Sequence, residues 1–303
     1  MAEALVLRGV SKSFAEVQAV QSLDLTVQAG TVYGLLGPNG AGKSTTIRMI
    51  MDIIKPDSGE ISLLGETDPD RRRDRTGYLP EERGLYRRMK ARELIVYLAR
   101  LHGMAAGAAR AEADHWLQRM ELSEWADSKL EALSKGMQQK LQLVATILHK
   151  PEMVILDEPF SGLDPVNVDL VRTILLELRD SGMTLLLSTH QMEMVEKLCD
   201  SICLIHHGRA VLQGPLHKIK AERGTRAIQI DYEGRPSFHK DRNLVARADD
   251  SGSYMELYAA SGVSPQEVLA AAAREVRVSR FQVMEPSLHQ IFVDTVRARG
   301  EEA

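Results

Sequence analysis

The sequence has only two cysteines, no long apolar run and no excess of basic residues. Cys199 and Cys203 are too few for a zinc site unless His206 and His207 contribute, so we expect buried free thiols. No stretch supplies the roughly 20 consecutive apolar residues of a membrane-spanning helix, and the N-terminal MAEALVLRGV lacks the pattern of a signal peptide. The formal net charge of -4 gives no basic field, which argues against nucleic acid as a partner. We therefore expect a protein that is cytosolic or peripheral to a membrane.

The composition is that of an ordinary globular protein. The chain has 303 residues, of which 44% are hydrophobic and 26% are charged, so it is long enough for one large domain and a small one. We place the large domain at residues 1–222 and a small C-terminal accessory domain of α+β type at residues 223–303.

Apolar runs alternate with helix-like stretches in the large domain. Val32–Leu36, Met153–Asp157 and Thr184–Ser188 are almost wholly apolar, as expected of parallel strands that are buried on both faces. Asn167–Asp180 has the periodicity of a helix. The alternation predicts an α/β core with a mostly parallel sheet, and short β-branched runs near the N-terminus predict an antiparallel β subdomain.

Strand signals are missing between about residues 82 and 150. Helical patterns occupy this segment instead, at Arg92–His102, Ala109–Met120 and Lys135–Leu148, so we expect an inserted helical subdomain. The C-terminal domain mixes both patterns. Its predicted strands are Ala227–Tyr232, Tyr254–Tyr258 and Val276–Val283, and its predicted helices are Pro265–Arg274 and Ser287–Arg297.

The segment GPNGAGKS fits the phosphate-loop pattern G-x-x-x-x-G-K-[ST]. It follows the predicted strand Val32–Leu36 and precedes the helix-like Thr45–Met51, which is the context that this motif requires. In such a loop backbone N–H groups surround a polyphosphate, a lysine adds positive charge near the β and γ oxygens, and a hydroxyl faces Mg²⁺. The residues expected to bind nucleotide here are Gly37, Pro38, Asn39, Gly40, Ala41, Gly42, Lys43, Ser44 and Thr45. The large domain is therefore predicted to be a phosphate-loop NTPase core.

Polar residues follow two other predicted strands. Asp157 and Glu158 come after MVIL, and His190 comes after TLLLS. Because ligands of an open parallel sheet lie at the carboxyl ends of its strands, we expect these residues to meet the phosphate loop. Asp157 is placed to hold Mg²⁺ through its water shell, Glu158 to act as a general base toward water, and His190 to hydrogen-bond the γ-phosphate.

Three further motifs carry a family resemblance. LSKGM at Leu133–Met137 precedes MVILDE, and SGLD at Ser161–Asp164 and STH at Ser188–His190 follow in order. With the phosphate loop, this set resembles the nucleotide-binding subunit of ATP-binding cassette (ABC) transporters over about Leu5–Gln213. The resemblance implies ATP and Mg²⁺ as cofactors and ATP hydrolysis as the activity, with Lys43, Glu158 and His190 in the catalytic roles.

The resemblance also implies a head-to-tail homodimer. Each ATP would be held between the phosphate loop of one copy and Ser134 and Gly136 of the other, with Asp164 at the dimer seam. Phe14 resembles the aromatic residue that stacks on adenine, although a phenylalanine that follows KS could equally belong to the core.

Two positions depart from the family pattern. Glu81, in GYLPEERGLY, stands where the family usually has a glutamine that contacts Mg²⁺; it could still ligate the metal but adds negative charge near the phosphates. Met137 stands where glutamine is commonest, while Ser134 and Gly136 are kept.

GYLPEERGLY, LSKGMQQK and the terminal EPSLHQIFVDTV resemble the branch of the family that serves two-component exporters, including sodium and drug efflux systems. The partner would then be a separate integral-membrane permease, with a helix received beside the helical subdomain, and the chain would lie on the cytoplasmic face of the cell membrane. Two alternatives stay open at this point: a soluble cassette ATPase that acts on the ribosome or DNA, and a nucleotide-gated regulatory module.

Overall fold

The computed structural model describes residues 2–82, 84, 86–223, 227–284 and 287–298. Positions 83 and 85 of GYLPEERGLY, positions 285 and 286 of the terminal motif and residues 299–303 of the predicted C-terminal domain lie outside this range. The chain folds as two compact units, Met1–Leu216 and His217–Ala303. The domain boundary predicted after residue 222 lies within helix α8 (Leu216–Arg223).

A six-stranded sheet forms the centre of the first unit. Its strand order is β5-β6-β7-β3-β8-β9, and every neighbouring pair is parallel except β8 and β9. All residues of β3, β6 and β7 are buried, which explains why their sequences are continuously apolar rather than alternating. The strands are β3 (Val32–Leu36), β5 (Thr76–Leu79), β6 (Met153–Asp157), β7 (Thr184–Thr189), β8 (Ser201–His206) and β9 (Arg209–Pro215).

A three-stranded antiparallel sheet of order β2-β1-β4 belongs to the same unit. It comprises β1 (Glu3–Phe14), β2 (Val17–Gln28) and β4 (Ser58–Leu63). Leu5, Leu7 and Val10 of β1 share a hydrophobic core with Ile47 and Ile50 of helix α1 (Lys43–Ile50). This core fixes α1, and therefore the loop in front of it, against the sheets.

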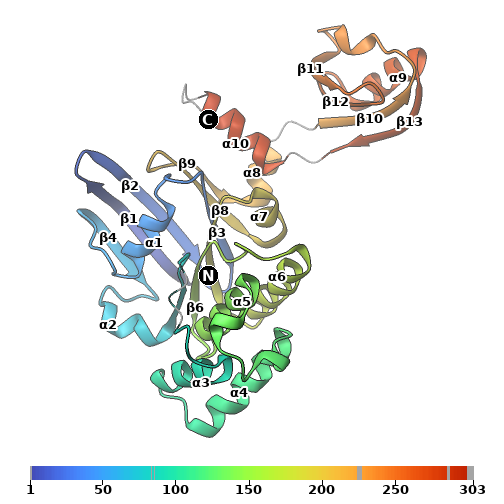
Figure 1. Ribbon diagram of the computed structural model, residues 1–303. Helices are drawn as coiled ribbons and strands as arrows, with labels where there is room; N and C mark the ends of the chain where they lie inside the picture. The colour runs from blue at the N-terminus through green and yellow to red at the C-terminus, as the bar shows by residue number, and fades with distance from the viewer. Residues whose placement is uncertain (1, 83, 85, 224–226, 285–286, 299–303) are drawn as a thin grey trace. The chain divides into compact units, whose positions relative to one another are not determined.

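Some helices of the first unit pack near the central sheet, and α3, α4 and α5 form a cluster of their own. Figure 1 shows α3, α4 and α5 grouped at one end of the first unit, with α6 beside them. Arg92 of α3 joins this cluster together through ion pairs with Asp114 and Asp127, both at 2.6 Å. The helices are α2 (Pro69–Arg72), α3 (Ala91–Leu101), α4 (Ala106–Arg119), α5 (Lys135–Ile147), α6 (Pro165–Asp180) and α7 (Met192–Leu198).

The second unit contains a four-stranded antiparallel sheet of order β11-β12-β10-β13. Ile228, Ile230 and Leu257 of this sheet pack with Val268 and Ala272 of α9 in a core of their own. Its elements are β10 (Ala227–Glu233), β11 (Val245–Asp250), β12 (Tyr254–Ala259), α9 (Pro265–Glu275), β13 (Arg277–Val283) and α10 (Leu288–Ala298).

The predicted fold class is confirmed: an α/β core with a mostly parallel sheet, an antiparallel β subdomain, a helical insertion and a small α+β unit. Strands β4, β5, β9 and β11 were not predicted. β5 has only four residues, and β11 reads VARADD, in which only Val245 is buried.

Candidate active site

The phosphate loop has a backbone that only glycine can adopt freely. It joins β3 to α1, and Gly37, Gly40 and Gly42 have positive φ angles of 152°, 78° and 108°. A Cβ on Gly42 would lie 2.3 Å from the carbonyl oxygen of Ala19, and a Cβ on Gly37 would lie 2.2 Å from that of Ile205. The motif glycines are therefore required by conformation and by close backbone approach.

Lys43 is the first residue of α1 and is 6% exposed. Its ammonium group donates to the carbonyl oxygens of Gly37 at 2.8 Å and Pro38 at 3.1 Å, and lies 4.0 Å from Oε1 of Glu158. Burial lowers the pKa of Lys43, while the nearby carboxylates of Glu158, Asp157 and Glu81 oppose that shift. The lysine is therefore held at the junction of the loop and the carboxylates.

Asp157 and Glu158 lie at the end of β6, next to the end of β7. The Ser188 hydroxyl donates to Oδ1 of Asp157, and the Thr189 hydroxyl donates to Oε2 of Glu158 at 3.1 Å. His190 lies with its Nδ1 2.8 Å from Oε1 of Glu158. The structure thus brings together the acidic pair and the histidine that the sequence placed at separate strand ends.

A cavity of about 510 Å³ lies over the loop. Lys43, Ser44, Glu81 and Glu158 line it together, so the acidic residue at the departure from the family pattern faces the same space as the lysine. Some of its lining was not predicted, and this part comes from β2 and from the turn between β8 and β9. The unpredicted residues are Val17, Gln18, Ala19, Gln21, His207 and Gly208, and the remaining predicted ones are Asn39, Gly40, Gly42 and Thr45.

The donor set in this cavity suits a hard cation. Ser44 offers a hydroxyl and Glu81 offers a carboxylate to this cavity, and Asp157 ends β6 directly before the lining residue Glu158. Within the described part of the chain, no group of three or more His, Cys, Asp or Glu side chains is arranged to hold a metal.

Seven predicted nucleotide contacts lie outside the described lining of this cavity. Three of them, Gly37, Pro38 and Ala41, belong to the phosphate loop itself, and four lie elsewhere in the chain. Phe14 ends β1 with 49% of its surface exposed, and its ring lies 5.6 Å from the Lys12 ammonium. Ser134 is the N-cap of α5 and accepts a hydrogen bond from the Met137 N–H at 3.2 Å. The other two, Gly136 and Asp164, lie on the first turn of α5 and at the N-cap of α6. Hydrogen bonds from Asn167 lower the pKa of Asp164.

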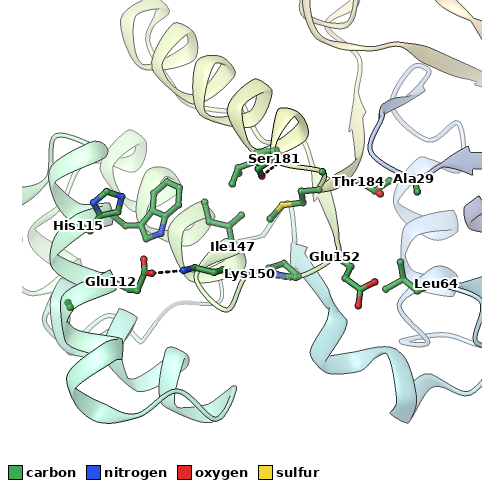
Figure 2. Close-up of a pocket in the computed structure, with 15 residues that line it drawn as sticks. Ala29, Leu64, Glu112, His115, Ile147, Lys150, Glu152, Ser181 and Thr184 are labelled. Atoms are coloured by element: carbon green, nitrogen blue, oxygen red, sulfur yellow. Dashed lines mark hydrogen bonds and ion pairs between the residues drawn. The ribbon is translucent and has the colours of Figure 1, made fainter. Parts of the chain in front are cut away.

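A second cavity, of about 780 Å³, is larger, but its charged side chains are already engaged in ion pairs (Figure 2). It lies at the amino end of the parallel strands, between α4 and the end of α6, away from the phosphate loop. Its charged residues are already paired, Glu112 with Lys150 at 2.7 Å and Glu152 with Arg75 at 2.6 Å. We therefore place the chemistry in the smaller cavity.

The two cysteines are free and buried, as predicted. Burial raises the pKa of Cys203 to about 12 and that of Cys199 as well, so neither is a ready thiolate.

Comparison with known proteins gives consistent matches. A sequence profile described as ABC transporter matches residues 20–161, and one described as ATP-binding protein DrrA1-3-like, C-terminal domain, matches residues 214–296. A shorter match, residues 127–196, is to an AAA domain described as putative AbiEii toxin, Type IV TA system.

Whole-length relatives and solved structures agree. The chain is 41% identical over 294 residues to YhaQ, an ABC transporter ATP-binding protein of Bacillus subtilis, covering 97% of this chain and 99% of the relative. It is 37% identical to Nod factor export ATP-binding protein I of Burkholderia lata, covering 94% of both. A solved structure described as an ATP binding subunit of an ABC transporter has a TM-score of 0.68 and 31% identity, covering 72% of this chain and 92% of its own.

The chain belongs to the ABC transporter ATP-binding protein family. It is an ATP-binding subunit of that family, and its enzymatic activity is ATP hydrolysis. The resemblance drawn from the sequence is confirmed, and the C-terminal match and the Nod factor export relatives support the exporter branch.

Proposed function

We propose that the chain hydrolyses ATP with Mg²⁺ at a composite site between two copies, and that this cycle powers a separate membrane permease in export. The observation that carries the proposal is the position of Glu158. Its carboxylate faces the cavity above the phosphate loop, 4.0 Å from Lys43 and 2.8 Å from His190. A carboxylate in that position can take a proton from water beside the γ-phosphate.

The remaining roles follow from the chemistry of the lining. Lys43 and the loop N–H groups bind the phosphates, and His190 donates to the γ-phosphate. Ser44, Asp157 and Glu81 hold Mg²⁺, which when bound neutralises charge on the phosphate oxygens. Phe14 stacks on the adenine, because its exposed ring lies at the tip of the β1–β2 hairpin, close in sequence to the lining residues Val17 and Gln18.

The proposed ATP site between two copies concerns Ser134, Gly136 and Asp164. Ser134 and Gly136 are not part of the described lining around Lys43, and in the proposed dimer a second copy supplies them to the same ATP. Asp164 begins α6, and the neighbouring Val166 is 75% exposed, leaving an apolar side chain for a partner to cover. These features fit a head-to-tail homodimer with two shared sites.

The permease is proposed to dock on an exposed patch that we call the α3 patch, formed by Tyr86, Tyr97 and Leu101. Their exposures are 58%, 42% and 64%, and the rings of Tyr86 and Tyr97 lie 6.2 Å apart. Tyr97 and Leu101 are one turn apart on α3 and so share a face. Exposed aromatic and aliphatic residues that gather in this way are typical of a protein contact.

Export and location rest on the relatives and on the sequence. Nod factor export proteins among the relatives favour export, and they favour the transporter role over an ATPase of the ribosome or DNA. Nucleic acid is not proposed as a partner, given the net charge of -4. No helix in the described part of the chain is long and apolar enough to span a bilayer. We place the chain at the cytoplasmic face of the membrane, held there by its permease.

The central test is Glu158→Gln. This variant should bind ATP as tightly as the wild type but turn over at least about 100-fold more slowly, because the amide cannot accept the proton from water. With ATP it should also accumulate as a dimer in light scattering, and adding Ser134→Arg should prevent that. Near-normal hydrolysis by Glu158→Gln would remove it from the role of base.

The α3 patch is tested by Tyr97→Arg. The variant should keep its own ATP hydrolysis but fail to co-purify in detergent with its membrane permease, since a charge would be placed in the contact. Tyr254→Arg, an exposed tyrosine of the second unit, is the matched control. Equal recovery of the permease with both variants would contradict docking at the α3 patch.

A further inference from the structure

Two consecutive hydroxyls of β7 face two consecutive carboxylates at the end of β6. Asp157 and Ser188 are partners in the register of the two strands, and the Ser188 hydroxyl donates to Asp157 Oδ1. One residue further on, the Thr189 hydroxyl donates to Glu158 Oε2 at 3.1 Å. All four residues are buried, so these bonds are shielded from competing water.

The Thr189 hydroxyl accepts one hydrogen bond and donates another. Its oxygen accepts a hydrogen bond from the Gln191 N–H at 3.1 Å, and a hydroxyl has a single proton to donate. That proton is donated to Glu158 Oε2 at 3.1 Å. The other oxygen, Oε1, is left toward His190 and Lys43.

Glu158 has a positive φ angle, a strained backbone conformation that neighbouring contacts must stabilise. Its φ angle is 50°, in the left-handed region that L-residues rarely adopt. Its N–H donates to the Ser188 carbonyl oxygen at 3.1 Å. Ser188 therefore holds the backbone of Glu158, while His190 and Thr189 contact its carboxylate, with the Thr189 hydroxyl on Oε2. Strain of this kind is typical of functional positions.

We propose that Thr189 is a positioning residue that fixes the Glu158 carboxylate, while Ser188 fixes Asp157, so that adjacent hydroxyls orient the base and the metal ligand separately. This rests on the proposed function, in which Glu158 is the base and Asp157 serves Mg²⁺. Groups that orient a reacting carboxylate or a metal ligand typically contribute about 10- to 100-fold.

The test compares Thr189→Val, which keeps the shape but removes the hydroxyl, with Thr189→Ser, which keeps the hydroxyl. In Thr189→Val kcat should fall about 10- to 100-fold with the Kd for ATP within about twofold of wild type, and Thr189→Ser should retain most of the activity. Thermal unfolding is measured alongside, because valine leaves the Gln191 N–H without its acceptor. Thr189→Ala replaces Thr189→Val if the valine variant does not fold.

Ser188→Ala should behave differently. With a non-hydrolysable ATP analogue, it should raise the Mg²⁺ concentration needed for half-maximal nucleotide binding by about tenfold. Thr189→Val should leave that concentration unchanged. Identical Mg²⁺ dependence for Ser188→Ala and the wild type would overturn the metal side of the proposal.

A double-mutant cycle separates positioning from a structural effect. If Thr189 acts through Glu158, Thr189→Val should cause no further loss of turnover in the Glu158→Gln background. The proposal for Thr189 is overturned if kcat of Thr189→Val stays within about threefold of wild type, or if the same loss appears in both backgrounds. Failure of the proposed function looks different, since Glu158→Gln alone would then remain active.

Discussion

Two glycines beside the Ala19 carbonyl oxygen and a third in open space allow a graded test of the phosphate-loop geometry. Gly42, Gly208 and Gly40 all have positive φ angles, of 108°, 76° and 78°. A Cβ would lie 2.3 Å from the Ala19 oxygen at Gly42 and 2.9 Å from it at Gly208, and it would meet nothing within 4 Å at Gly40. Alanine substitution therefore imposes the same type of backbone strain at each position but a different steric clash.

The expected losses can be worked out from these distances. Alanine in a left-handed conformation costs about 1–2 kcal/mol, which is the whole effect at Gly40. At Gly42 the backbone must also move by about 1 Å to restore a normal C···O separation, and such overpacking typically adds about 1–3 kcal/mol. We expect about 3 kcal/mol of destabilisation for Gly42→Ala and an intermediate value for Gly208→Ala.

The assay is denaturant unfolding without nucleotide, so that lost phosphate contacts do not contribute. The transition of the first unit is followed in all three variants and in the wild type. A loss for Gly40→Ala as large as that for Gly42→Ala would refute the reasoning, because strain alone would then explain both. A stable Gly42→Ala would show that β2 is not close to the loop.

Three further predictions concern other parts of the chain. Lys43→Ala should raise the Kd for ATP by about 10- to 100-fold, as expected for losing charge-assisted hydrogen bonds; an unchanged Kd in equilibrium binding would contradict the loop assignment. Burial, aided by His102, lowers the pKa of His149 from 6.5 to about 4, so as the pH falls the unfolded chain takes up the proton first and stability should decline between those values. In denaturant unfolding at each pH, His149→Gln should show a shallower decline, and an equal slope would exclude this histidine as the cause. Tyr232→Phe removes the hydrogen bond to Asp250 and should destabilise the second unit by about 1 kcal/mol with ATP affinity unchanged; a wild-type unfolding curve would mean that this bond contributes nothing.

Much of the fold was predictable because strands that are buried on both faces have continuously apolar sequences. Strands β3 and β6 have the predicted bounds, since both faces are covered and every position must be apolar or end at the site. Strand β11 was missed for the opposite reason. Its sequence VARADD is largely exposed, and it is a strand through its pairing with β12 rather than through burial.

The residues of the candidate site also fall into a predictable group and an unpredictable group. Gly42 and Lys43 were predictable because a phosphate loop demands specific backbone conformations and a charge. Ala19 and Gly208 were not, because they line the cavity through backbone that comes close in space from distant parts of the chain. Thr189 lay within a predicted motif, but its role depends on the register of β6 and β7, which one sequence does not specify.

The proposed sharing of each ATP between Lys43 of one copy and Ser134 of the other has a consequence for genetics. Suppose that two inactive alleles, one with Lys43→Ala and one with Ser134→Arg, are expressed together. In the proposed head-to-tail pair, one mixed site would carry both substitutions, while the other would join an unaltered phosphate loop to an unaltered Ser134. Intragenic complementation should then restore part of the activity that neither allele has alone.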